Sequence, residues 1–325
     1  MTRHVLITGA SGFVGQELAS ALLAASADYH LTLTDVAAPK SPPRADPSRI
    51  TATQTDLTDP GAAAALLDTQ KWHAVYTLHG IMSSGSEANL ELGYRVNLDA
   101  HRHIYDHLRV HQPLTTVIYT SSTAVYGPPR TAGPSQTFTE STMPLPQSSY
   151  GTQKLIIEHL LNDYARRGLL DARVVRLPTV MVRPGAPTAA ASSFASGIVR
   201  EPLNGEKSVL PVSKDLHMWV CSPATVVANL VAVKDVPAAK FEGLLTRTVN
   251  LPGVTVKIAD ILDALEAVGG KEARGLVEEK ADPVIEKIVL SWPEKFDVSR
   301  GLELGLKPDG SLIETVKAYA ASLKK

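Results

Sequence analysis

Three glycines between an apolar run and a helical pattern constrain this chain more than any other feature. The stretch HVLITGASGFVG places a β-branched run directly before Gly9, Gly12 and Gly15, and residues 13–25 then carry apolar side chains at helical spacing. Glycine permits a tight turn and a close approach of the backbone to a ligand, while the free N–H groups at a helix start attract phosphate. The sequence therefore predicts a strand, turn and helix that bind a pyrophosphate.

Short β-branched runs alternate with helical patterns through the first half of the chain. This alternation predicts an α/β fold, a Rossmann-type doubly wound parallel sheet with helices on both faces. Further strands are predicted at residues 30–36, 50–57, 73–78, 115–122 and 172–178, and helices at residues 60–69, 87–109 and 148–167.

The pattern loosens after Pro178 into a segment rich in alanine, serine, proline and glycine, which predicts loose connections around a substrate. Helical patterns return at residues 226–231, 256–268 and 311–324, with a strand at 247–251 between them. We expect a smaller mixed α/β substrate-binding domain. The predicted cofactor-binding domain comprises residues 1–177 plus about 217–252, and the substrate-binding region comprises about 178–216 plus 253–325.

The composition excludes several classes of partner. The chain of 325 residues has 32 basic and 33 acidic side chains, so it has no basic surplus for nucleic-acid phosphates or anionic lipid. Cys221 is the only cysteine, which excludes an internal disulfide and a cysteine-based zinc cluster. We therefore expect a cytoplasmic protein without nucleic-acid, membrane or metal partners.

Asp35 indicates which dinucleotide the glycine turn binds. It ends the predicted second strand about 20 residues after Gly15, where a carboxylate accepts hydrogen bonds from the adenosine ribose and repels a 2′-phosphate. Lys40 and Arg44 lie in a proline-rich loop that we expect to point away. NAD is therefore favoured over NADP. Asp56, at the end of the third predicted strand, is either a contact to the adenine amino group or a solvated acid.

Tyr150 and Lys154, in the stretch SSYGTQK, lie one helical turn apart. A tyrosine has a pKa of about 10 and is a poor base near neutral pH unless a positive charge stabilises its phenolate. Lys154 on the same helix face supplies such a charge, and an oxidised nicotinamide adds a second. The preceding stretch YTSSTAVYG ends a predicted strand in hydroxyl residues, which places Ser122 beside Tyr150.

These motifs resemble the extended branch of the short-chain dehydrogenase/reductase superfamily, which includes the NAD-dependent epimerases and dehydratases. The resemblance implies that Tyr150 is the general base, that Ser122 orients the reacting hydroxyl, and that Lys154 binds the nicotinamide ribose and lowers the tyrosine pKa. It implies that Asn97 helps to hold the lysine and its water. The cofactor residues it implies are Gly9, Ser11, Gly12, Phe13, Val14, Gly15, Asp35, Asp56, Leu57, Leu78, Tyr150, Lys154, Pro178 and Val180.

Two departures from the epimerase pattern bear on the substrate. The chain has TLHG after the fourth predicted strand, where His79 is interpreted as a core or loop histidine, and RLPTVMVRPG after the sixth. The second segment resembles a narrower group, the D-erythronate dehydrogenases, which implies oxidation of a four-carbon sugar acid at C2 with NAD. An arginine guanidinium binds a carboxylate well, because it can donate two parallel hydrogen bonds to it. The substrate candidates are Ser84, Ser122, Thr123, Tyr150, Thr179, Arg183, Ser192 and Arg200.

Two other functions stay open at this point. An NDP-sugar epimerase or dehydratase would hold NAD tightly and return the hydride, and the replaced segment counts against it. A non-catalytic sensor of NAD(H) would have no use for the tyrosine and lysine. The resemblance also implies a homodimer through residues 87–109 and 148–167, where Leu155, Ile156 and Leu160 add apolar surface.

Overall fold

A parallel sheet of seven strands forms the centre of the molecule, which confirms the predicted fold class. The computed structural model describes residues 2–129, 136–185 and 190–323. The strand order is β10-β6-β5-β4-β1-β2-β3, so the order along the sheet reverses between β1 and β4. The strands are β1 (Arg3–Thr8), β2 (Tyr29–Asp35), β3 (Ile50–Gln54), β4 (Trp72–Thr77), β5 (Thr116–Ser122), β6 (Asp171–Leu177) and β10 (Thr248–Asn250).

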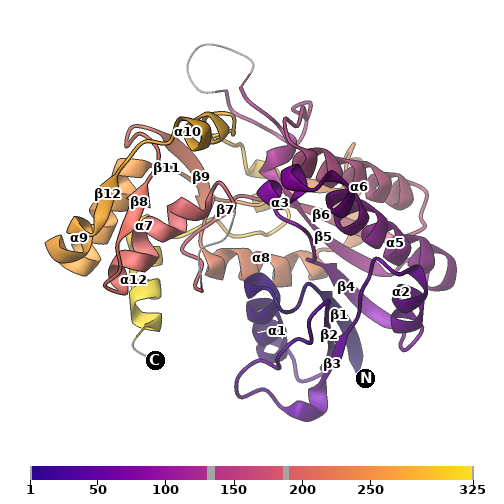
Figure 1. Cartoon of the computed structure of the whole chain (residues 1–325). Helices are drawn as coiled ribbons and strands as arrows, with labels where there is room; N and C mark the ends of the chain where they lie inside the picture. Colours follow the sequence, from indigo (N-terminus) through magenta and orange to yellow (C-terminus); the bar gives the residue numbers. More distant parts are fainter. Residues whose placement is uncertain (1, 130–135, 186–189, 324–325) are drawn as a thin grey trace.

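Helices cover both faces of this sheet because successive strand residues point to opposite sides. Val5 and Ile7 of β1 pack with α1 (Phe13–Ala25) and α8 (Pro223–Asp235) on one face. Leu6 packs on the other face with three further helices, which Figure 1 shows on the opposite side of the strands. These helices are α2 (Pro60–Leu67), α5 (Ala100–His111) and α6 (Ser149–Arg166).

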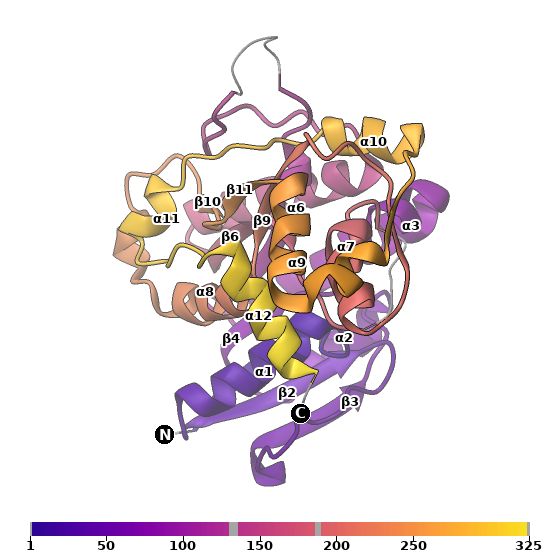
Figure 2. The same cartoon turned by 90° about the vertical axis from the view of Figure 1, so that its left-hand side faces the viewer.

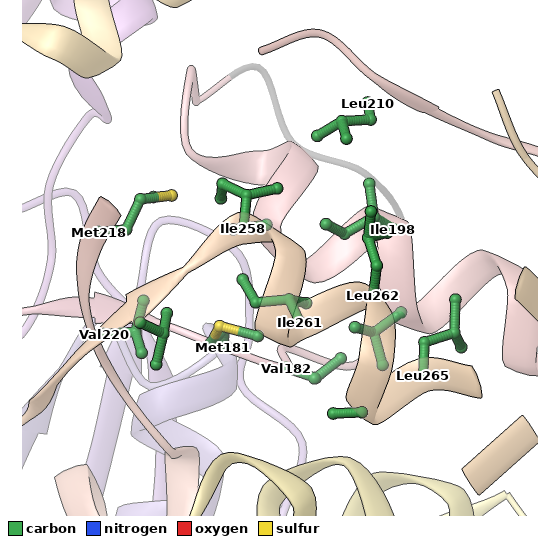
Figure 3. Close-up of a cluster of buried hydrophobic side chains, with 14 of the residues drawn as sticks. Met181, Val182, Ile198, Leu210, Met218, Val220, Ile258, Ile261, Leu262 and Leu265 are labelled. Carbon is green, nitrogen blue, oxygen red and sulfur yellow. The ribbon is translucent and has the colours of Figure 1, made fainter. Parts of the chain in front are cut away.

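A second hydrophobic cluster forms from residues after Pro178. Figure 3 shows Val220 of β9, Ile198 of α7, Ile261 of α9 and Met181, just after β7, converging in it. Figure 2 shows α7, α9 and α12 side by side. The division of the chain into two domains at the predicted boundaries stays a prediction. The elements here are β7 (Thr179–Val180), α7 (Ser193–Leu203), β8 (Ser208–Leu210), β9 (His217–Cys221), β11 (Val254–Lys257), α9 (Ile258–Gly275), β12 (Val277–Glu279), α10 (Pro283–Leu290) and α12 (Leu312–Ser322). The short helix α11 (Ser299–Glu303) lies beside β10 of the large sheet.

The single helix predicted at residues 87–109 is wrong, because the chain breaks there at Asn89. The backbone of Asn89 is extended, with φ −140° and ψ 92°, and its side chain accepts a hydrogen bond from Leu92 N at 3.0 Å, which caps a new helix. The pieces are α3 (Ser83–Ala88), α4 (Leu90–Tyr94), a π-helical turn (Arg95–Asp99) and α5. Short 3-10 helices occur at Pro47–Arg49, Thr123–Val125 and Ala238–Phe241.

Part of the segment predicted as loose connections is also helical. The helix α7 buries Ala195, Ile198 and Val199 in the cluster that it shares with α9, so this segment contributes to a packed core. The helix predicted to start at residue 256 starts at Ile258 instead, after the strand β11. Within the described parts of the chain, no helix combines the length and apolarity needed to cross a bilayer.

Candidate active site

The glycine turn lies where the strand order reverses, at the carboxyl ends of β1 and β4. Gly9 has φ +67°, and a Cβ atom on it would lie 2.6 Å from the backbone nitrogen of His79. A Cβ atom on Gly15 would lie 2.6 Å from the carbonyl oxygen of Gly9. Both positions therefore require glycine, the first because the chain directly after β4 comes so close and the second because α1 starts within the turn.

A cavity of about 1260 Å³ opens beside this turn. It runs from the glycines along the carboxyl ends of the strands to α7 and α10. Ser11 and Asn97 lie outside its lining, and every other predicted cofactor or substrate residue lines it. The predicted residues in the lining are Gly9, Gly12, Phe13, Val14, Gly15, Asp35, Asp56, Leu57, Leu78, Ser84, Ser122, Thr123, Tyr150, Lys154, Pro178, Thr179, Val180, Arg183, Ser192 and Arg200.

The carboxylate of Asp35 is held at one end of the cavity by two backbone amides. Ser11 N donates to Oδ2 at 3.0 Å, and Val36 N donates to Oδ1 at 2.7 Å. The Ser11 hydroxyl is turned away from the cavity and donates to the Ala37 carbonyl at 3.0 Å. The carboxylate of Asp35 suits the hydroxyls of the adenosine ribose and repels a 2′-phosphate, while the open glycine turn suits the pyrophosphate of NAD.

Asp56 lines the same end of the cavity but is already hydrogen-bonded. Its Oδ1 accepts from the hydroxyl of Thr58 at 2.8 Å and from Thr58 N at 2.9 Å, and these bonds lower the pKa of the Asp56 carboxyl. One carboxylate oxygen therefore closes the local turn. The predicted contact from Asp56 to adenine stays a prediction.

Replacing Asp35 with asparagine is expected to relax the preference for NAD. The change removes one negative charge and a charge-assisted hydrogen bond, which corresponds to about tenfold or more in affinity. We expect the ratio of kcat/KM for NADP to that for NAD to rise at least about tenfold, measured by reduced-cofactor absorbance. Asp263→Asn, an exposed acid on α9, is the matched control and should leave the ratio unchanged. An unchanged ratio in Asp35→Asn would contradict the predicted ribose contact.

Tyr150, Ser122 and Lys154 meet inside the cavity. Ser148 caps α6 by accepting from Gly151 N at 3.1 Å, which fixes the helix start and places Tyr150 in its first turn. The hydroxyls of Tyr150 and Ser122 are hydrogen-bonded to each other. The Nζ atom of Lys154 donates to the Thr120 carbonyl at 2.9 Å and lies 5.6 Å from the centre of the Tyr150 ring.

Burial works against ionisation of both groups in the protein alone. It raises the pKa of Tyr150 to about 12, although the hydrogen bond from Ser122 and the positive charge of Arg183 act in the opposite direction. It also lowers the pKa of Lys154 to about 8, against the charge of Glu158. A tyrosine base here therefore needs a further positive charge, which an oxidised nicotinamide supplies when bound.

Asn97 belongs to the π-helical turn, a feature often found at functional sites. Its Oδ1 accepts from Ile81 N at 2.8 Å, and its Nδ2 donates to the Ile81 carbonyl at 3.0 Å and to Gln153 Oε1 at 2.8 Å. These bonds attach the loop after β4 to α6. The predicted role of Asn97 in holding Lys154 and a water stays a prediction.

Two arginines reach the substrate end of the cavity, and their environments differ. The guanidinium of Arg200 lies 2.5 Å from Glu201 Oε1 and donates to the Arg183 carbonyl at 3.0 Å. Arg183 lines the cavity close enough to Tyr150 for its charge to lower the pKa of the tyrosine, and within the described residues it has no ion pair with a carboxylate. Burial, and then the charge of Arg200, lower the pKa of Arg183. Arg183 is therefore the better placed of the two to receive an anion.

His79 is buried, as expected for a core or loop histidine, but it also lines the cavity, and its Nε2 has no hydrogen-bond partner among the described residues. Its Nδ1 lies 2.6 Å from Thr8 Oγ1, and its ring stacks on that of His101 with the centres 3.9 Å apart. Burial lowers the pKa of His79 to about 3, so the ring is neutral under physiological conditions.

Sequence reasoning missed the wall that closes the far end of the cavity. Ile288 of α10 lies there with Trp292, Pro293 and Met218. Residues 283–293 are more than a hundred positions from the catalytic motifs and match no motif, so the only available signal was their apolar character. Within the described residues no cluster of side chains suited to a metal ion occurs.

A reversed strand order, a glycine turn at that point and a tyrosine–lysine pair beside it define a dinucleotide-dependent oxidoreductase. Residues 5–239 match the NAD dependent epimerase/dehydratase family, and the chain belongs to this family. The predicted resemblance is therefore confirmed, the cofactor is NAD, and the protein is an NAD-dependent oxidoreductase of the extended short-chain type.

Proteins of three kinds are similar to this chain. The chain is 42% identical to a D-erythronate dehydrogenase of Cupriavidus necator over 97% of both chains, and 40% identical to one of Haemophilus influenzae over 97% of this chain and 98% of the relative. The structure of a nucleoside-diphosphate-sugar epimerase of Agrobacterium tumefaciens has a TM-score of 0.90 and 33% identity, covering 98% of this chain and 94% of that one. An L-threonine dehydrogenase of Cupriavidus necator, 23% identical with a TM-score of 0.86, shares the fold over 98% of this chain and 99% of its own.

Proposed function

We propose that this protein oxidises the C2 hydroxyl of a small sugar acid, D-erythronate or a close relative, to the 2-keto acid. The observation that carries the proposal is the cation of Arg183, which lines the cavity near Tyr150 and has no ion pair with a carboxylate among the described residues. A carboxylate held there places the neighbouring C2 hydroxyl near the tyrosine. Two relatives that are 42% and 40% identical over nearly the whole chain are D-erythronate dehydrogenases, which supports an acid as substrate.

The reaction assigns one role to each side chain. Tyr150 removes the proton of the C2 hydroxyl, while Ser122 hydrogen-bonds the same oxygen. Lys154 binds the nicotinamide ribose and keeps a positive charge near the phenolate. Bound NAD supplies the acceptor for the hydride that leaves C2. The alcohol thereby loses a hydride and a proton and becomes a ketone, and the walls of the cavity limit the access of water to it.

The assay for this proposal combines purified protein, NAD and a panel of four- to six-carbon aldonic acids, with UDP- and dTDP-sugars alongside. We expect steady NADH formation with D-erythronate or a close relative, and the C2 assignment requires a 2-keto acid when the product is analysed by NMR. The 33% identical structure is named as a nucleoside-diphosphate-sugar epimerase, which keeps that function as the second candidate. If a sugar nucleotide is converted without net formation of NADH, the epimerase function should replace our proposal. A sensor would bind NAD and convert nothing.

We also propose that two copies form a homodimer through α4, α5 and α6. These helices leave large apolar side chains in contact with water, including Leu90, Val110 and Ile156, which are 55%, 59% and 38% exposed. Covering such a surface with a second copy removes apolar area from water. Sedimentation of the purified protein at twice the mass of one chain would support the dimer. The cytoplasmic location stays a prediction.

A further inference from the structure

A buried carboxylate lies directly behind the tyrosine–lysine pair. Glu158 follows Lys154 by one turn of α6, and it is 2% exposed. It does not line the cavity among the described residues, so its environment is made by protein groups. An acid buried in this way needs a counter-charge and hydrogen bonds.

Arg176 of β6 supplies both. Its Nε lies 2.9 Å from Glu158 Oε1, and its Nη2 lies 2.5 Å from Oε2, which is the two-pronged geometry of a strong ion pair. The remaining Nη1 donates to the hydroxyl of Tyr126 at 2.6 Å, and that hydroxyl donates to Asn250 Oδ1 at 2.8 Å. The pair is therefore fixed from β6, β10 and the turn after β5.

Three side chains of α6 bind three consecutive residues at the end of β5. Tyr150 bonds the hydroxyl of Ser122. Lys154 donates to the carbonyl of Thr120 at 2.9 Å, and Glu158 accepts from the hydroxyl of Ser121 at 2.5 Å. The three helix residues are four positions apart and share one face. Glu158 therefore forms the third attachment of the catalytic helix to the strand that carries Ser122.

We propose that Glu158, clamped by Arg176, is a positioning residue that acts through Lys154. Its carboxylate keeps the lysine ammonium charged in a buried site, and its bond to Ser121 holds α6 against β5 so that Tyr150 meets Ser122. This inference rests on the roles proposed above for Tyr150 and Lys154.

Other ionisable groups around Lys154 do not supply this charge. The burial that surrounds His79 and His101 lowers both of their pKa values far below neutral, and it raises that of Tyr119 well above 10, so these groups stay neutral while the lysine titrates. The ionisable groups that interact with Lys154 or with the pair are His79, His101, Tyr119, Tyr126, Tyr150, Glu158 and Arg176. Glu140 acts on Tyr126 and Arg183 acts on Tyr150.

The test follows the titration of Lys154 by NMR, in protein labelled at the lysine side-chain nitrogen and with the signal assigned from Lys154→Met. In Glu158→Gln the charge of Arg176 is left uncompensated, so the Lys154 midpoint is expected to move about one pH unit or more to lower pH. In Arg176→Met the carboxylate is uncompensated, and the midpoint moves to higher pH. The alkaline limb of kcat/KM should move in the same direction in each variant.

Asp171→Asn is the matched control, because it also breaks a pair with a buried arginine of β6, Arg173, away from the cavity; Asp171 pairs in addition with Arg247. It should lower thermal stability and leave the Lys154 midpoint in place. If Glu158→Gln folds and its Lys154 titration midpoint has not moved, the inference is overturned. If Glu158→Gln does not fold, an unmoved Lys154 midpoint in Arg176→Met overturns it. The titration needs no substrate, so shifted midpoints without oxidation of any acid would overturn the proposed function alone.

Discussion

Tyr150→Phe is expected to lower kcat for acid oxidation by about 10³-fold while NAD binding is retained. The tyrosine hydroxyl lies in the cavity, hydrogen-bonded to Ser122, and general-base catalysis by a positioned group contributes about 10²–10⁴-fold. Phenylalanine keeps the ring and removes only the proton acceptor. Reduced-cofactor absorbance gives kcat, and calorimetric titration with NAD reports whether the cofactor site is intact.

Tyr164→Phe provides the matched control for this change. Tyr164 lies on the same helix, and its hydroxyl donates to Asp106 at 2.5 Å, outside the cavity lining. We expect Tyr164→Phe to keep kcat near that of the unmodified protein. A Tyr150→Phe variant with full turnover would mean that another group removes the proton, and it would withdraw the general base from the mechanism.

Local signals explain how well the first half of the fold could be predicted. The helix predicted at residues 13–25 coincides with α1, and the one predicted at 148–167 differs from α6 by one residue at each end. Both have apolar side chains at helical spacing, and α6 starts at a serine cap. The break at Asn89 depended on a side chain competing with the helix for a backbone N–H, which periodicity does not reveal.

In the site, too, features with a local sequence pattern could be predicted, and features that depend on contacts between distant residues could not. The predicted residues at strand ends converge because parallel strands bring their carboxyl ends to one edge of the sheet. The pairing of Glu158 with Arg176 was not predicted, because a glutamate within an amphipathic helix has the pattern of a solvated residue. The wall from α10 was missed for a related reason, since contacts between segments far apart in sequence leave no spacing to read.

Arg183→Met is expected to raise the KM for the acid by about a hundredfold while the affinity for NAD changes little. Losing a charge-assisted, two-pronged contact to a carboxylate costs about 2–3 kcal/mol, which corresponds to that factor. A decrease in kcat should accompany it, because the charge of Arg183 lowers the pKa of the buried Tyr150. Arg183→Lys should have a KM between that of Arg183→Met and that of the unmodified protein, since lysine keeps the charge but lacks the two parallel hydrogen bonds of a guanidinium.

The neutral amide of the same acid separates binding of the carboxylate from the effect on Tyr150. It lacks the negative charge, so its KM should be nearly the same with Arg183 and with Met at this position, while its kcat should still fall in Arg183→Met. Arg200→Met is the comparison within the protein: its side chain is paired with Glu201, so we expect lower thermal stability and a much smaller change in KM for the acid. A hundredfold rise in KM from Arg200→Met with none from Arg183→Met would transfer the carboxylate contact to Arg200.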